Sequence, residues 1–289
     1  MSNVITKSFS SELFSQQTVQ GMTGNKTIRV TPELAEQWLQ WNKKNRPISL
    51  AHVRRLVREM EKGNWMLNGQ ALIFSDTGRL LDGQHRLTAV SHLGQSILMD
   101  VCFGVDPESF KTIDQGKKRT ASDVISIKGF ANYSQVAAAA KTVIIYDSTN
   151  KNVNSSDAKP SNSDILKWVE DNPSIHDEVT FALSLYAASD RLILTGSKLA
   201  SYLFITRRIS GDTDKFFTSL CTGIPMDKKN VIYLLRKVLI RAKLDNTRSL
   251  SRTVERGLVV TAWNKWKEGK DVKLLRFNPD QQKGQARFK

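Results

Sequence analysis

The residues best suited to chemistry stand together in one segment, which runs Asp82, Gly83, Gln84, His85 and Arg86. At the start of a helix, unpaired N–H groups and the helix dipole stabilise a phosphate or carboxylate. Gly83 has no Cβ, so a ligand can approach the backbone closely, and Arg86 can grip the same anion with two N–H groups. Asp82 and His85 are the candidate catalytic residues, and His85 could act as a general acid or base or only donate to phosphate. The segment therefore predicts a phosphate- or nucleotide-binding site formed by Gly83 to Arg86.

Short elements on both sides must place this segment at a helix start. Residues 71–81 read as two short strands joined by a turn signal. Apolar residues then recur at helical spacing from Leu87 to Leu93, and Gly94 stands where a helix would end. Asp82 is the expected N-cap of this helix.

A second interpretation is an ordinary capped helix whose Arg86 and His85 face solvent. The two interpretations differ in geometry. An anion site requires the N–H groups of Gly83 to Arg86 to point into an open pocket that also receives the Arg86 side chain. If the helix start is buried and Arg86 is paired with an internal acid, the nucleotide hypothesis fails. For an exposed site residue, Arg86→Ala should abolish ligand binding and leave the fold intact.

The same residues, followed by Leu87 and Ala89, resemble the DGQHR motif of the ParB/sulfiredoxin-like superfamily. In that superfamily a Gly-x-x-Arg turn at a helix start contacts a nucleotide phosphate or a phosphorylated substrate. The resemblance implies this role for Gly83 and Arg86, with the two residues between them in the variable middle.

The resemblance extends over residues 26–128, about a third of the chain. Residues 45–49, the basic helix after them and residues 63–65 are similar to the early helical part of such domains in phage and mobile-element proteins. The resemblance implies a fold more than an activity, because one fold hosts unrelated functions.

Further sequence features limit the chemistry. If the turn binds a cofactor, we expect a nucleoside triphosphate with Mg²⁺ beside Asp82, although capping explains Asp82 without a metal. His85 and His92 lie two helical turns apart, roughly 10 Å, which is too far for both to bind one metal ion. The sequence has no P-loop, no Gly-x-Ser-x-Gly motif and no acidic cluster of the two-metal nuclease kind. It therefore predicts no metal site and does not establish catalysis.

A polar loop supplies a second candidate for phosphate contact. Lys117, Lys118 and Arg119 are consecutive cations in this loop. Loops with such clusters tend to carry function, and in the related domains the equivalent region lies near the ligand turn.

The positive charge is concentrated near the end of the chain. The whole chain carries +15, whereas residues 228–289 alone hold 17 Lys and Arg against 5 Asp and Glu, a net charge of +12. A local excess of this size is typical of a surface that binds a polyanion, and a generally basic soluble face is the alternative. In the helix expected at 228–244, the cations Arg236, Lys237 and Arg241 lie away from the apolar stripe. We expect them to contact DNA.

The next expected helix adds three arginines. Arg248, Arg252 and Arg256 stand four residues apart, so on one helix they would form a ridge. Like charges at this spacing repel, and an anion would neutralise them. Pairing with acids on a neighbouring helix is the alternative.

Together these patterns predict an α+β fold with an N-terminal ParB/sulfiredoxin-like α/β domain and a C-terminal all-α domain. The boundaries give a flexible arm or a loosely docked extension at 1–25, the α/β domain at 26–128, a basic helical domain at 129–275 and a basic tail at 276–289, which we expect to be flexible from Lys283 to Lys289. Helices are expected near 134–147, 161–171, 174–188, 196–208, 212–221, 228–244 and 250–267. The two cysteines form no metal-type pair, and no segment resembles a signal peptide or membrane span, so we expect a cytoplasmic protein that does not contact membranes.

The favoured function is DNA binding by a phage or mobile-element protein, with the DGQHR turn holding a nucleotide or phosphate. One alternative is an enzyme on the same turn, either a nuclease or a nucleotide-dependent hydrolase or phosphotransferase. A further alternative is a module that inhibits or modulates a host protein. The expected partners are DNA, a nucleotide and a second copy of the chain as a dimer.

Overall fold

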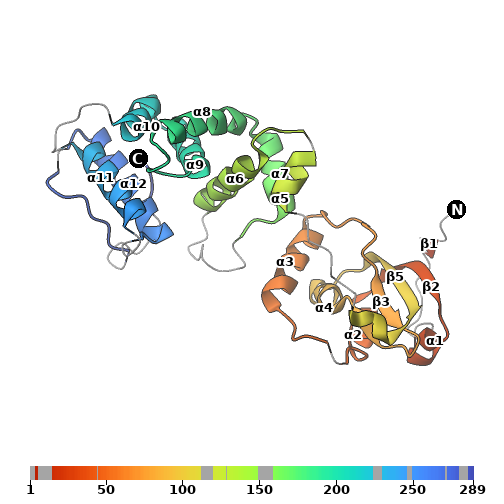
Figure 1. The fold of residues 1–289 in the computed structure, drawn as a ribbon. Coiled ribbons are helices and arrows are strands. Elements are labelled where there is room, and N and C mark those ends of the chain that lie inside the picture. The colour runs from red at the N-terminus through yellow and green to blue at the C-terminus, as the bar shows by residue number, and fades with distance from the viewer. Residues whose placement is uncertain are drawn as a thin grey trace. The chain divides into compact units, whose positions relative to one another are not determined.

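A computed structural model shows a mixed α+β protein that divides into two compact units, Met1–Lys118 and Arg119–Lys289. It describes residues 4–5, 15–43, 45–111, 120–127, 129–148, 159–223, 230–245, 249–270, 272–279 and 286–289. In these ranges all strands belong to the first unit, and the second unit is built from helices (Figure 1). The sequence-based boundary after residue 128 lies ten residues beyond the division between the units.

The first unit is organised around a five-stranded sheet with the order β1-β2-β5-β3-β4. Its strands are β1 (Val4–Ile5), β2 (Gly24–Val30), β3 (Leu72–Ser75), β4 (Leu80–Asp82) and β5 (Ile97–Val105). β5 pairs antiparallel with β2 and parallel with β3, and β3 pairs antiparallel with β4. Met99, Val101 and Phe103 of β5 are buried, as expected from its alternating pattern.

Three helices of this unit, α1 (Gln16–Gln20), α2 (Pro32–Leu39) and α3 (Leu50–Glu61), begin at side-chain caps. The unit also contains α4 (Gln84–Leu93) and a 3₁₀ turn, η2 (Pro107–Lys111). Thr31 accepts a hydrogen bond from the first turn of α2, and Ser49 does the same for α3. Trp38 of α2 is fully buried, with its ring 5.0 Å from that of Phe74.

The N-terminal residues that are described do not behave as an arm. Val19 of α1 is fully buried, and Gln20 donates a hydrogen bond to the carbonyl oxygen of Thr77. β1 pairs with β2 and so extends the sheet. The expectation of a flexible segment at 1–25 is therefore wrong for these residues.

The second unit contains the helices that the periodicity predicted, with ends shifted by a few residues, and they are preceded by one short helix that is not among those predictions. In chain order the helices are α5 (Ala121–Ile127), α6 (Tyr133–Asp147), α7 (Asn162–Asp171), α8 (Ile175–Ala188), α9 (Gly196–Arg207), α10 (Thr213–Thr222), α11 (Val231–Leu244) and α12 (Arg252–Lys267). Every residue of α9 from Leu199 to Thr206 is buried, so α9 is the central helix of this unit.

The last four residues are docked into the helical core, so the expectation of a flexible tail is wrong for them. The Phe288 side chain is 7% exposed, and its ring centroid lies 5.7–6.1 Å from those of Tyr146, Tyr202 and Trp263. The Phe288 N–H donates to the Tyr146 hydroxyl at 3.0 Å, and Trp263 Nε1 donates to the carbonyl of Lys289 at 3.1 Å. The terminal segment is thus held by both apolar packing and hydrogen bonds.

Candidate functional site

The DGQHR turn has the predicted strand–turn–helix form, but its glycine serves packing. β4 ends at Asp82, and Gly83 is the N-cap of α4, with φ of 109°. This cap makes no side-chain hydrogen bond, so Asp82 is not the cap that we expected. A Cβ on Gly83 would collide with the Leu72 side chain of β3. The glycine therefore allows the turn to lie against the sheet.

Arg86 is bound within its own unit. Its side chain is 12% exposed, and Nη2 donates to Asp82 Oδ2 and to the carbonyl oxygen of Ala71, each at 2.9 Å. Nη1 donates to the carbonyl oxygen of Gln70. The guanidinium therefore ties the start of α4 to the end of β4 and to the chain that enters β3.

Gln84 and His85 bind the loop between α2 and α3. Gln84 Nε2 donates to the carbonyl of Arg46 at 2.9 Å, and its Oε1 accepts from Asn42 Nδ2 at 2.8 Å. His85 Nε2 accepts from the backbone N–H of Ser49 at 3.0 Å. Both side chains are buried, with 5% and 8% exposed. This loop therefore covers the start of α4.

The two conditions under which the nucleotide hypothesis fails are both met, because the helix start is buried and Arg86 is paired with Asp82. The expectation of an open anion pocket at Gly83 to Arg86 is wrong. The two candidates for catalysis, Asp82 and His85, accept hydrogen bonds from the chain itself. Among the described residues, no three His, Cys, Asp or Glu side chains are grouped as metal ligands. Lys117, Lys118 and Arg119 lie outside the described residues.

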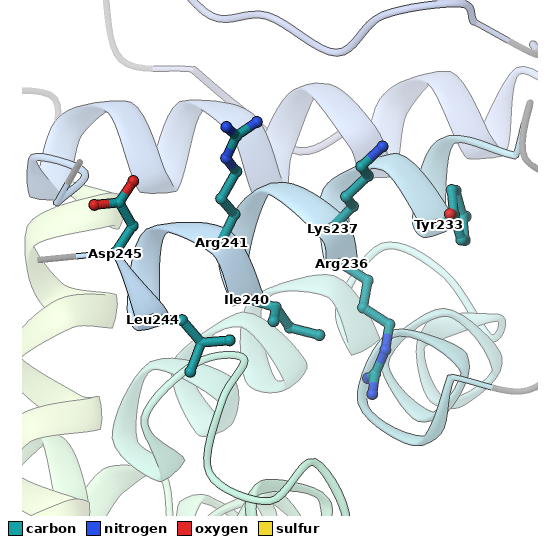
Figure 2. A pocket seen from close by; sticks show the side chains of 7 residues that line it. All are labelled: Tyr233, Arg236, Lys237, Ile240, Arg241, Leu244 and Asp245. Atoms are coloured by element: carbon teal, nitrogen blue, oxygen red, sulfur yellow. The ribbon is translucent and has the colours of Figure 1, made fainter. Parts of the chain in front are cut away.

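The second predicted surface is formed by α11, which has two distinct faces. Val231, Ile232, Leu235 and Leu239 are buried against the helical core. The other face borders an open hollow of about 650 Å³ (Figure 2). The hollow is lined by Tyr233, Arg236, Lys237, Ile240, Arg241, Leu244 and Asp245. Cationic and apolar side chains thus share one face of α11.

Lys237 and Arg241 are the exposed cations of this face. They stand one helical turn apart and point to the same side of α11 in Figure 2. Neither forms an ion pair with any described residue in the structure. Their charges are available to an anionic partner.

Arg236 differs from them, and the expectation that it contacts nucleic acid is not supported. Its Nη1 donates to the carbonyl oxygens of Leu220 and Cys221, both at 2.6 Å. A Cβ on Gly223 would lie 2.9 Å from Arg236 Nε, so the guanidinium packs closely over the end of α10. Arg236 therefore satisfies carbonyl groups that a helix leaves unpaired at its C-terminus.

Burial next to this cap makes Cys221 a poor nucleophile. The side chain is fully buried, and this burial raises the pKa of the thiol to about 12, although the Arg236 charge acts in the opposite direction. Because the thiolate is the reactive form, we expect iodoacetamide at pH 8 to leave Cys221 unmodified in the native Cys102→Ser variant. The same variant should be alkylated in denaturant. Mass spectrometry of the protein measures both, and native alkylation at Cys221 would contradict the burial.

The predicted ridge of three arginines is not a feature of α12. This helix begins at Arg252 after the N-cap Ser251, so Arg248 precedes it and also lies outside the described residues. Arg252 is exposed and Arg256 is half-buried. On the same helix, Glu255 pairs with Lys198 of α9 at 2.6 Å. Only two of the three arginines therefore share a helix.

A further charged cluster has a structural role. Arg207 bridges Glu178 of α8 at 2.8 Å and Asp214 of α10 at 2.6 Å. Burial raises the pKa of the Glu178 carboxyl, and the Arg207 charge opposes this shift. The cluster joins three helices through one guanidinium.

No match is found when the chain is compared with protein-family models, curated proteins and solved structures. Its chemistry therefore has to be read from its own residues. None of the helices in the described ranges is both long enough and apolar enough to cross a bilayer.

The apolar side chains of the α11 hollow were missed in the sequence. Tyr233 stands one helical turn before Lys237, and Ile240 stands one turn before Leu244. None of the three is fully buried, although Ile240 packs partly against the core. Apolar residues on the polar face of an amphipathic helix were the available signal.

Proposed function

We propose that this chain is a DNA-binding protein of phage or mobile-element type and that α11 of the helical unit provides the contact surface. The observation that carries the proposal is the pair Lys237 and Arg241, exposed one turn apart beside a hollow and without an ion-pair partner among the described residues. Cations placed in this way bind backbone phosphates and release counterions.

The distribution of charge supports the same surface. Residues 228–289 carry a net charge of +12, and α11 lies at the start of this segment. Residues 82–86 lead us to propose that the first unit is a ParB/sulfiredoxin-like domain. In this unit the motif turn has a structural role, because Arg86 links it to neighbouring segments. Two free cysteines agree with a reducing, cytoplasmic setting for DNA binding.

Salt dependence tests the proposal. For the wild type, log Kd should rise with log salt concentration by roughly 0.9 for each phosphate neutralised on duplex DNA. In the Lys237→Ala/Arg241→Ala variant, we expect this slope to fall by about one unit per lost contact, because two phosphates are no longer neutralised. Fluorescence anisotropy titrations of the full chain at several salt concentrations measure the slopes.

A matched control removes the same charge elsewhere in the unit. Lys141 on α6 and Lys167 on α7 are exposed cations, so Lys141→Ala/Lys167→Ala changes the net charge equally. This control should keep the wild-type slope. Equal slopes for both double variants would remove α11 from the surface, and a wild type that does not bind at near-physiological salt would exclude DNA as the partner.

A further inference from the structure

We infer that the α11 hollow accepts single-stranded nucleic acid, with unpaired bases in the hollow and phosphates on Lys237 and Arg241. The inference rests on the proposed function and specifies its substrate. It concerns the face of α11 that lines the hollow in Figure 2.

This face of α11 carries apolar side chains that phosphate binding does not require. Cations alone neutralise phosphates, yet Tyr233, Ile240 and Leu244 line the same hollow. Leu244 is 68% exposed and lies beside the two cations on the same face of α11. Unpaired bases have apolar faces, and they stack on aromatic side chains in positively charged grooves. Tyr233 is the stacking residue in this arrangement.

The shape of the site favours a strand over a duplex. In a duplex the bases are stacked inside, so their faces cannot enter a hollow in a protein surface. The hollow of about 650 Å³ is open to solvent along the face of α11. Bases that are free to leave their stack can fill it, whereas a duplex would contact only the cations.

The cations are arranged to follow the backbone of such a strand. Arg241 stands four positions after Lys237, so the two side chains leave the helix about 6 Å apart along its axis. This spacing suits successive phosphates of an extended strand. Asp245 lines the C-terminal end of the hollow. The phosphates therefore lie along Lys237 and Arg241, and the bases turn toward the apolar side chains.

The test compares fluorescein-labelled oligothymidine with a labelled mixed-sequence duplex of equal length, using the full chain. We expect oligothymidine to bind at least about tenfold more tightly at the same salt concentration. Tyr233→Ala should weaken oligothymidine binding by about 5- to 100-fold and change duplex binding little, because stacking acts only on unpaired bases. Tyr233→Phe should restore binding, since a phenyl ring also stacks.

Two further variants separate stacking from folding. Tyr133→Ala removes a half-exposed tyrosine of α6 and should bind oligothymidine like the wild type. Leu244→Glu changes an exposed side chain, so it should preserve the fold while it weakens oligothymidine binding. Circular dichroism melting verifies that each variant is folded.

Three results would overturn the inference. If the duplex binds as tightly as oligothymidine and Tyr233→Ala weakens neither, the inference fails and the proposed function stands. If both probes bind but Leu244→Glu has no effect on either, the hollow is not the site of the bases. If neither probe binds while a poly-glutamate peptide does, the inference and the proposed function both fail, and an acidic protein is the partner.

Discussion

Phe288→Ala should lower the free energy of unfolding of the helical unit by about 3–5 kcal/mol, the usual cost of removing a buried phenyl group. The ring packs among Tyr146, Tyr202 and Trp263, and these residues belong to three different helices. Its loss leaves a cavity that rigid aromatic neighbours cannot close. Urea denaturation followed by circular dichroism measures the change.

Leu274→Ala is the matched control for Phe288→Ala. Leu274 lies in the same C-terminal region and is 56% exposed, so its truncation should change stability by only about 0.5 kcal/mol. If both variants are as stable as the wild type, the terminal segment is not docked in solution, and the original expectation of a free tail would be restored.

The sequence predicted the helices of the second unit well because the relevant signal is local. Apolar residues at helical spacing, together with caps such as Ser161 and Ser251, mark where these helices begin. The buried stripe of α11 was predicted in the same way. The sequence also predicted Lys237 and Arg241 outside this stripe, but it did not predict that Tyr233 and Leu244 line the same face.

Docking of the C-terminus was not predictable, since it depends on residues far away in the chain. Residues 286–289 are too few to show a period, and their composition is polar except for Ala286 and Phe288. The hydrogen bonds that hold them are made with Tyr146, Trp263 and Asn264. A terminal aromatic residue becomes a core residue only when the fold supplies a slot for it.

The DGQHR turn shows a different limit. Its type was predicted correctly, and Gly94 ends α4 as expected. The partners of the Arg86 guanidinium were not predicted, because they include the backbone carbonyls of Gln70 and Ala71. Every residue carries a backbone carbonyl, so the residue types do not show which carbonyls bind an arginine. The same sequence pattern is therefore expected for a structural arginine and for an anion site.

Arg86→Ala distinguishes these two roles by stability. If Arg86 has this structural role, Arg86→Ala should lower the free energy of unfolding by about 2–4 kcal/mol. The Arg86 side chain is only 12% exposed, and its loss removes a charged donor from two carbonyls and from the carboxylate of Asp82. Arg86→Lys should be intermediate, because an ammonium group cannot reach all three acceptors in the same geometry. Hydrogen exchange of peptides from β3 and α4 places the effect in the first unit.

The control for Arg86→Ala is Arg29→Ala, which removes an exposed cation of β2 and should change stability by only about 0.5 kcal/mol. Isothermal titration of the wild type with nucleoside triphosphates and Mg²⁺ completes the test. If Arg86 has a structural role, the Arg86→Ala variant has a lower free energy of unfolding than the wild type, and the wild type shows no nucleotide binding that depends on Arg86. The opposite result, an Arg86→Ala variant of full stability that has lost nucleotide binding present in the wild type, would assign the turn to an anion site.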